Sequence, residues 1–300
     1  MPRLGLQLSR KVHHMTGLKI NAARWLTLAA SCALLAATTN KPETQTAVVS
    51  PRAYSDADKL DPAMAKLLEG TPVTINVQNM PVLTAINELS KTSGYTIKPG
   101  YDGMFNRGRT GGNITVSHAN DPFWVVFRDI ATRGNLSLIN WGNSNENTIN
   151  IAPQNYGNGE LKGPTSIQGP FLTTINQIER ENTVVMSDPK KVTRTIHINT
   201  QMYVEPKLKL EQVSYRPTVD EAGDDNGNNM VPPEQNERGT EGSNGIAWWG
   251  QIDLPYPTTN PGTHITKLKG RMSAKLKNAP ASSSGRDINM PFELVNLPLP

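Results

Sequence analysis

Residues 71–152 decide the fold, because a strand–helix–strand pattern occurs there twice. The first copy reads Thr71-Pro-Val-Thr-Ile-Asn-Val77, then Pro81 to Gly94, then Tyr95-Thr-Ile97. The second reads Asn113-Ile-Thr-Val116, then Pro122 to Gly134, then Leu136-Ser-Leu-Ile139. In each copy a strand leads into a helix that a proline opens and a glycine closes, and another strand follows. The repeat predicts a duplicated α+β module.

Residue periodicity supports both copies. Val73, Ile75 and Val77 alternate with polar residues, as in a strand with one buried face. Helical spacing predicts one apolar stripe per helix, formed by Val82, Leu83, Ile86 and Leu89 in the first copy and by Phe123, Val126, Phe127 and Ile130 in the second. Gly94 suits the left-handed residue that ends many helices. Asp121 is the expected N-cap before Pro122.

The sequence also predicts the structure of the segments before and after the second copy. A polar turn at residues 142–147 joins Leu136, Leu138 and Trp141 to Ile149 and Ile151, which predicts a hairpin. The glycine-rich connector at residues 99–112, which contains Arg107 and Arg109, is expected to be an exposed mobile loop.

With these residues in view, residues 71–152 resemble the short N-terminal domain shared by secretins and TonB-dependent receptors. The resemblance rests on Val73–Val77, Leu83, Ile86 and Leu89 before Gly94-Tyr95-Thr-Ile97, Ile114-Thr-Val116, Phe127 and Ile130 before Gly134-Asn-Leu136, and Ile149-Asn-Ile151. It implies an α+β fold and a periplasmic adaptor that contacts other envelope proteins. The connector and Phe123-Trp124 depart from the usual pattern. The resemblance therefore implies an adaptor type rather than a role in secretion or uptake.

An export signal is expected in residues 1–37. A basic stretch through Arg24 precedes the apolar run Trp25–Ala37, which is too short to span a bilayer but fits a signal-peptide core. Two cleavage sites compete. Leu28-Ala-Ala-Ser-Cys32 resembles a lipoprotein processing site that would leave Cys32 lipidated, whereas the apolar residues that follow favour cleavage near Ala37 or Thr38. The expected location is the periplasm or the outer membrane, with membrane contact only through such a lipid anchor.

The basic character of the chain belongs largely to this leader. Residues 1–32 hold five basic residues and no acidic one, so 30 − 5 = 25 Lys and Arg face 26 Asp and Glu in the remainder. A nucleic-acid partner would need a basic face on the mature domain, and none is expected. The sole cysteine, Cys32, excludes an internal disulfide.

Composition and strand patterns predict how the rest of the chain is organised. We expect a tether at residues 38–70, the module at 71–153, a linker at 154–164 and an all-β, immunoglobulin-like sandwich at 165–300. Residues 221–245, rich in Asn, Gly and Glu, are expected to form a disordered loop. The candidate strands of the sandwich are 167–178, 193–204, 207–215, 246–254, 264–276 and 290–297.

No catalytic, cofactor or metal site is predicted. The acidic segment 220–229 does not fit an EF-hand, because placing Gly227 at position six puts Ala222 and Pro233 at two ligand positions. His118, His197 and His264 lack paired zinc spacing and are expected on strand surfaces. Phosphate-binding loops and serine-hydrolase elbows are also missing from the sequence.

Trp248 and Trp249 are the candidates for stacking against a ligand. Adjacent strand residues point to opposite faces, so we expect one in the core and one at the surface. The leading hypothesis is a non-catalytic envelope adaptor that docks a protein through an edge strand of the module. The alternative is a β-sandwich that binds a ligand such as a glycan, and a hydrolase ranks third.

Overall fold

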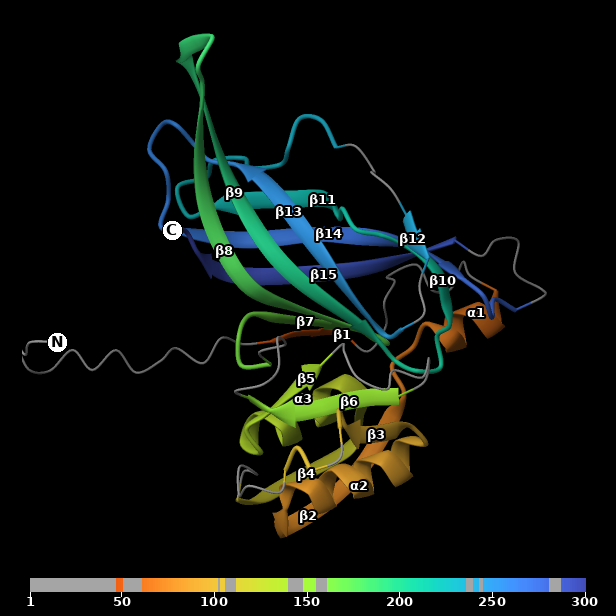
Figure 1. Cartoon of the computed structure of the whole chain (residues 1–300). Helices are drawn as coiled ribbons and strands as arrows, with labels where there is room; N and C mark the ends of the chain where they lie inside the picture. The colour runs from red at the N-terminus through yellow and green to blue at the C-terminus, as the bar shows by residue number, and fades with distance from the viewer. Residues whose placement is uncertain are drawn as a thin grey trace, which may run out of the picture. The chain divides into compact units, whose positions relative to one another are not determined.

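Two small sheets and two helices form residues 71–153 of this computed structural model (Figure 1). Strands β2 (Pro72–Pro81) and β4 (Asn113–Pro122) pair antiparallel as a two-stranded sheet. In a three-stranded sheet, β6 (Thr148–Pro153) lies between the parallel β3 (Thr96–Pro99) and the antiparallel β5 (Leu136–Ile139). Helices α2 (Val82–Ser93) and α3 (Phe123–Arg133) contact each other and strands of both sheets.

The structure describes residues 47–50, 61–101, 103–105, 112–139, 148–154, 161–235, 240–242, 245–280 and 287–300. Contacts group residues 44–300 into one unit, apart from residues 1–43. The expected leader, with Cys32 and both cleavage sites, lies outside the described residues.

The first helix confirms the sequence prediction, and the second differs in detail. Gly94 ends α2 at φ 74°, in the left-handed region that glycine adopts at low cost. Pro122, not Asp121, is the N-cap of α3, since Asp121 Oδ2 lies 2.8 Å from His118 Nδ1 instead. After α3 the left-handed residue is Asn135, at φ 52°.

The second half, residues 165–300 and here called the β-domain, is β-rich and is built around two five-stranded sheets. The first has the order β1 (Val48–Ser50), β7 (Thr165–Gln168), β8 (Phe171–Val185), β9 (Asp188–Val204) and β13 (Ala247–Pro255). In the second, β14 (His264–Leu276) pairs with β15 (Asp287–Pro298), β11 (Thr218–Asp224) and β10 (Leu210–Ser214), which in turn pairs with β12 (Thr240–Gly242). Inward-facing residues of both sheets share one apolar core.

The segments expected to form the tether, with a helical turn or two at residues 61–68, and the disordered loop both contribute to this part of the fold. Within the tether, β1 pairs in parallel with β7, and α1 (Pro62–Leu67) buries Met64 in the β-domain core. The prediction of a disordered loop is wrong for residues 221–235. Its first residues belong to β11, Met230 is fully buried, and Gln235 hydrogen-bonds both the N–H and the carbonyl of Val219.

Buried polar contacts join the module to the β-domain. The Trp124 indole N–H donates to the Pro170 carbonyl at 2.9 Å. Glu205 is fully buried and accepts from the Thr71 N–H at 3.0 Å, the Thr71 hydroxyl at 2.5 Å and the Tyr95 hydroxyl at 2.8 Å. Burial and the nearby Glu205 charge raise the pKa of Tyr95. These contacts therefore hold the module against the β-domain.

Candidate functional site: the β8–β9 arm and the His197 cluster

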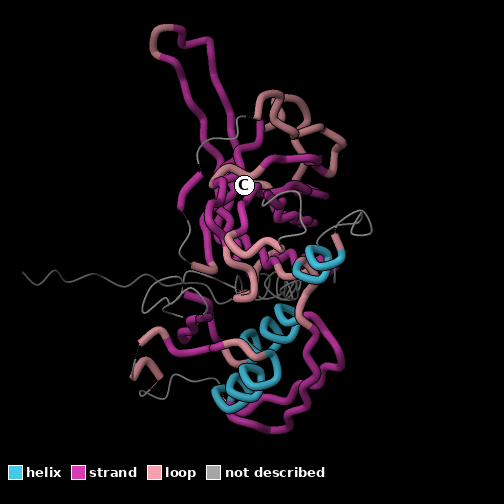
Figure 2. Tube along the Cα trace, turned by 90° about the vertical axis from the view of Figure 1, so that its right-hand side faces the viewer, coloured by secondary structure: helices cyan, strands magenta, loops and turns pink. Residues whose placement is uncertain are grey.

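The hairpin of β8 and β9 extends beyond its neighbouring strands. Figures 1 and 2 show this ribbon reaching past the rest of the β-domain. β13 accompanies β9 as far as the Pro255–Thr195 pair, and β7 accompanies β8 only over its first residues. Residues 182–194, here called the arm, pair only with each other among the described strands. All of them except Val185 are exposed.

The end of the arm carries apolar side chains. Val184 and Val192 are direct cross-strand partners and are each 46 % exposed. Met186, in the turn, is 85 % exposed, the largest value among the exposed large apolar side chains of the described residues. The valine pair and the methionine, here called the tip, place three exposed apolar side chains at the far end of the arm. Apolar side chains exposed together at one end of an element can serve as an interaction site.

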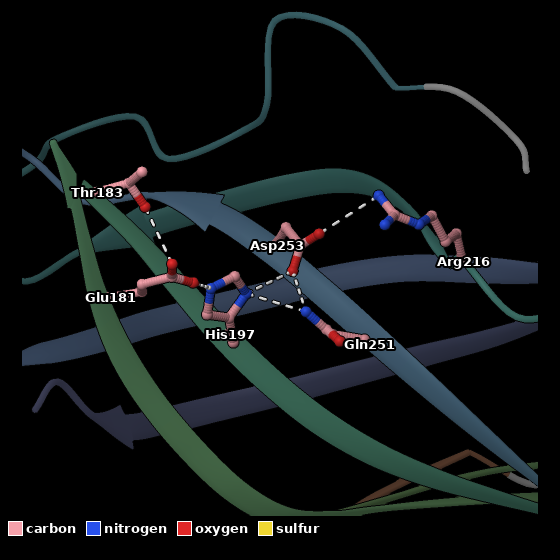
Figure 3. Close-up of polar contacts among 6 residues, drawn as sticks. All are labelled: Glu181, Thr183, His197, Arg216, Gln251 and Asp253. Carbon is pink, nitrogen blue, oxygen red and sulfur yellow. Dashed lines mark hydrogen bonds and ion pairs between the residues drawn. The ribbon is translucent and has the colours of Figure 1, made fainter. Parts of the chain in front are cut away.

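A histidine bridges three strands at the base of the arm (Figure 3). His197 on β9 places Nε2 2.8 Å from Glu181 Oε2 of β8 and Nδ1 2.8 Å from Asp253 Oδ1 of β13. The Thr183 hydroxyl donates to Glu181 at 2.9 Å. On the other side, the Gln251 amide donates to Asp253 at 2.7 Å, and Arg216 Nη1 lies 3.4 Å from the same carboxylate.

This arrangement favours the imidazolium form of His197. The hydrogen bond to Asp253 is the largest cause that raises the pKa of His197, and Glu181 adds to it against the effect of partial burial. Reciprocally, the hydrogen bond from His197, followed by that from Thr183, lowers the pKa of Glu181. The charged cluster ties β8 to β9 and β9 to β13 where the arm leaves the sheet.

The same geometry argues against acid–base catalysis by His197. Both ring nitrogens are held by carboxylates, so neither is free to accept a proton from a substrate. Thr183 directs its hydroxyl at Glu181 rather than at the imidazole. The cluster is better suited to holding strands together than to activating a nucleophile.

Replacing His197 with glutamine should lower stability in a pH-dependent way. A raised His197 pKa gives stability that is present below the ordinary value of 6.5 and is lost as the pH rises through the raised value. A lowered Glu181 pKa gives stability that is present above 4.5 and is lost as the pH falls through the lowered value. The difference in urea midpoint between wild type and H197Q should therefore be largest between these limits. It should be modest, because solvent screens half-exposed ion pairs.

The matched control is H264Q, which removes an imidazole whose Nδ1 contacts the Thr263 hydroxyl. Its difference from wild type should not follow that of H197Q with pH. Equal midpoints for wild type and H197Q at every pH would show that the cluster does not stabilise the base of the arm.

The two tryptophans lie as expected. Trp248 packs against the β-domain core, whereas Trp249 is 44 % exposed on the opposite face of β13. Gln251 and Asp253 follow Trp249 at two-residue spacing and so share its face. They also line a cavity of about 110 Å³ together with Arg216, Glu234 and Gln235.

The other polar candidates are accounted for by hydrogen bonds. Asp224 accepts backbone N–H groups from Asn226, Asn228 and Gly262, and Asp225 accepts from Thr263. These carboxylates brace two turns instead of surrounding a cation. Among the described residues, no group of three His, Cys, Asp or Glu side chains is arranged for a metal ion. His118, His197 and His264 belong to separate elements.

Three features of the structure were not found from the sequence. Glu205 follows the strand pattern at Met202-Tyr-Val204 and carries no motif. The arm lacks an alternating apolar pattern because neither of its faces is buried. The third is the His197 cluster, which joins residues from three strands. The register of those strands places Asp253 opposite His197. The spacing of these residues in the sequence does not reveal that they are neighbours.

The comparisons with known proteins do not assign the chain to a family. No protein-family model matches the chain, and searches of curated proteins and of solved structures also found no match. Within the described ranges, no helix has the length and apolar character needed to cross a bilayer.

Proposed function

We propose that the chain is a non-catalytic exported interaction protein whose module docks a partner protein by strand addition. The observation that carries this proposal is the two-stranded sheet of β2 and β4. Each strand is ten residues long, and each has a strand partner on one side only within the described structure. An extended segment of a partner can pair with such an edge through main-chain hydrogen bonds.

The side chains of this sheet leave its edges unguarded. Natural edge strands are commonly protected by lysine or other charged residues. Residues 73–80 of β2 and 113–120 of β4 contain no Asp, Glu, Lys or Arg. The apolar face of the sheet is covered, since Val73, Ile75 and Val77 belong to the core around α2 and α3. The edges, rather than the face, are therefore the surface for a partner.

Reciprocal contacts between the strands support the internal duplication. The Asn79 N–H donates to the Thr115 hydroxyl at 2.9 Å, and the Asn120 N–H donates to the Thr74 hydroxyl at 2.9 Å. Both asparagines have positive φ, and each precedes the proline at the start of a helix by two residues. The resemblance of residues 71–152 to the short N-terminal domain of secretins and TonB-dependent receptors favours an adaptor of that type. The proposal includes this kinship, a periplasmic or outer-membrane location and an immunoglobulin-like β-domain.

The test adds lysines beside the open edge. Asn76 and Gln78 are exposed on β2, so N76K/Q78K should leave the fold intact while opposing strand addition. Affinity capture from native envelope extract with residues 44–300 should recover a protein partner that N76K/Q78K loses. The charge-matched control T84K/N87K places the same two charges on exposed positions of α2 and should retain the partner. Equal capture by both variants would contradict docking at this edge.

A ligand-binding role for the β-domain is the second candidate. Trp249, Gln251 and Asp253 share one face of β13 beside the cavity that Arg216 lines. An exposed indole can stack on a sugar ring while planar polar groups bond its hydroxyls. Capture of glycan rather than protein, with loss of binding in W249A, would favour this role over the adaptor.

A further inference from the structure

We propose that the tip of the arm inserts into the interface of an anionic lipid bilayer. This contact uses a different surface from the β2–β4 edges, and it does not require a lipid on Cys32. It therefore stands independently of strand addition by the module.

The apolar part of the tip lies at the end of the ribbon. The Val184–Val192 pair and the Met186 side chain together present three apolar groups to solvent. The strands reach the tip from the well-packed β-domain, where Ile196 and Ile198 of β9 are fully buried. The arm thus holds a small apolar wedge away from the body of the domain (Figure 1).

Basic residues lie beside and behind this wedge, because Lys190 and Lys191 stand between Asp188 and Val192 in β9 and Arg194 pairs with Asn182. The arm contains Lys190, Lys191 and Arg194 against one acidic residue, Asp188, which gives a formal charge of 3 − 1 = +2. All three cations are exposed, and none of them forms an ion pair with a described residue. A basic residue close to an anionic membrane strengthens binding by about fivefold. The cations are placed to meet lipid phosphates while the tip enters the headgroup region.

A bilayer fits this tip better than a second copy of the chain. The tip is a convex end, and a protein partner would need an apolar pocket to receive it. The two cavities described on this chain are lined mainly by polar and charged residues, one around Arg216 and Asp253 and one around Lys275 and Asp287. A lipid interface instead accepts a small apolar protrusion and supplies the negative charge that the cations require.

Vesicle co-sedimentation tests the proposal with residues 44–300, because the apolar run Trp25–Ala37 would itself bind lipid. The chain should bind vesicles of phosphatidylcholine mixed with phosphatidylglycerol and should bind pure phosphatidylcholine at least tenfold more weakly. Added salt should weaken binding to the anionic vesicles, because it screens exposed charges. Absence of binding to the mixed vesicles would overturn the proposal.

Two sets of variants separate the apolar and ionic parts. V184T/M186S/V192T keeps β-branched residues in the strands and should weaken binding at least tenfold. K190Q/K191Q should also weaken it at least tenfold. The control V295T alters an exposed valine of β15 outside the arm and should bind like wild type. Binding that survives both arm variants would assign the contact to another surface.

A single fluorescent label gives an independent readout. Residues 44–300 contain no cysteine, so M186C and V295C each accept one environment-sensitive dye. The emission of the dye at position 186 should shift to the blue on anionic vesicles, whereas the dye at 295 should not respond. A shift at 186 that requires a captured protein, with no response to vesicles, would identify a protein pocket as the partner and refute lipid insertion.

Discussion

Glu205→Ala is expected to lower the free energy of unfolding of residues 44–300 by about 3–5 kcal/mol. The side chain is fully buried, and its carboxylate accepts hydrogen bonds from the Thr71 backbone and from two hydroxyl groups. Lys207 Nζ lies 3.4 Å from the same carboxylate. Truncation would leave these donors unpaired at the junction between module and β-domain. Urea unfolding followed by circular dichroism measures the loss.

Two further variants make this result specific. E205Q preserves the shape but turns an amide toward groups that donate, so its loss should be smaller than that of E205A but clearly measurable. E179A removes an exposed carboxylate from β8 and should stay within about 0.5 kcal/mol of wild type. If E205A unfolds at the same urea concentration as E179A, the junction does not hold the two parts together.

Phe127→Ala should cost about 3–5 kcal/mol, and Ile86→Ala about 2–5 kcal/mol. Both side chains are buried between the helices and sheets of the module. The Phe127 ring also makes an edge contact with Trp124, whose indole reaches the β-domain. Removing it therefore leaves a cavity beside the junction. Chemical unfolding of the two variants gives the values.

The control for these core variants is N87A, which changes an exposed residue of α2. It should unfold within about 0.5 kcal/mol of wild type. Should F127A and I86A both match N87A, the assigned helix faces would be incorrect.

Most helices and strands of residues 71–153 were predictable because their sequence signals are local. Alternation at Val73, Ile75 and Val77 marks β2, and the apolar stripe with Gly94 marks α2 and its end. These features arise when a single face is buried. At the start of α3 the local signal failed, because Asp121 pairs with His118 across the strand end instead of capping the helix. A histidine three residues away on the same strand, and not the helix end, is the partner of this carboxylate.

The β-domain was predictable in strand content and less so in strand limits. The sequence predicts a strand over residues 264–276, as β14 forms, and every second residue of that strand from Leu268 to Leu276 is buried. Residues 182–194 were mostly not assigned, because the paired strands of the arm expose both faces. In residues 221–235, the apolar side chains that contact the core are Ala222, Met230 and Val231, and three such residues among Asn, Asp and Gly give no periodic signal.

The candidate site lay beyond sequence reasoning for a related reason. Glu181, His197 and Asp253 are brought together by strand register and not by spacing. The alternation of strand faces predicts that Trp248 and Trp249 lie on opposite faces, but it does not tell which of the two is exposed. The sequence alone does not show which residues face each other on neighbouring strands. The cluster at the base of the arm depends on such neighbours.

Hydrogen–deuterium exchange of residues 44–300, alone and with the captured partner, tests the central claim most directly. Outward-facing amides of an open edge exchange quickly until a partner strand pairs with them. Strand addition predicts slower exchange in Pro72–Pro81 or Asn113–Pro122 on binding, and slowing in Pro72–Pro81 should be absent in N76K/Q78K. Protection confined to Ala247–Pro255, around Trp249, with both module strands unchanged, would contradict docking through the module.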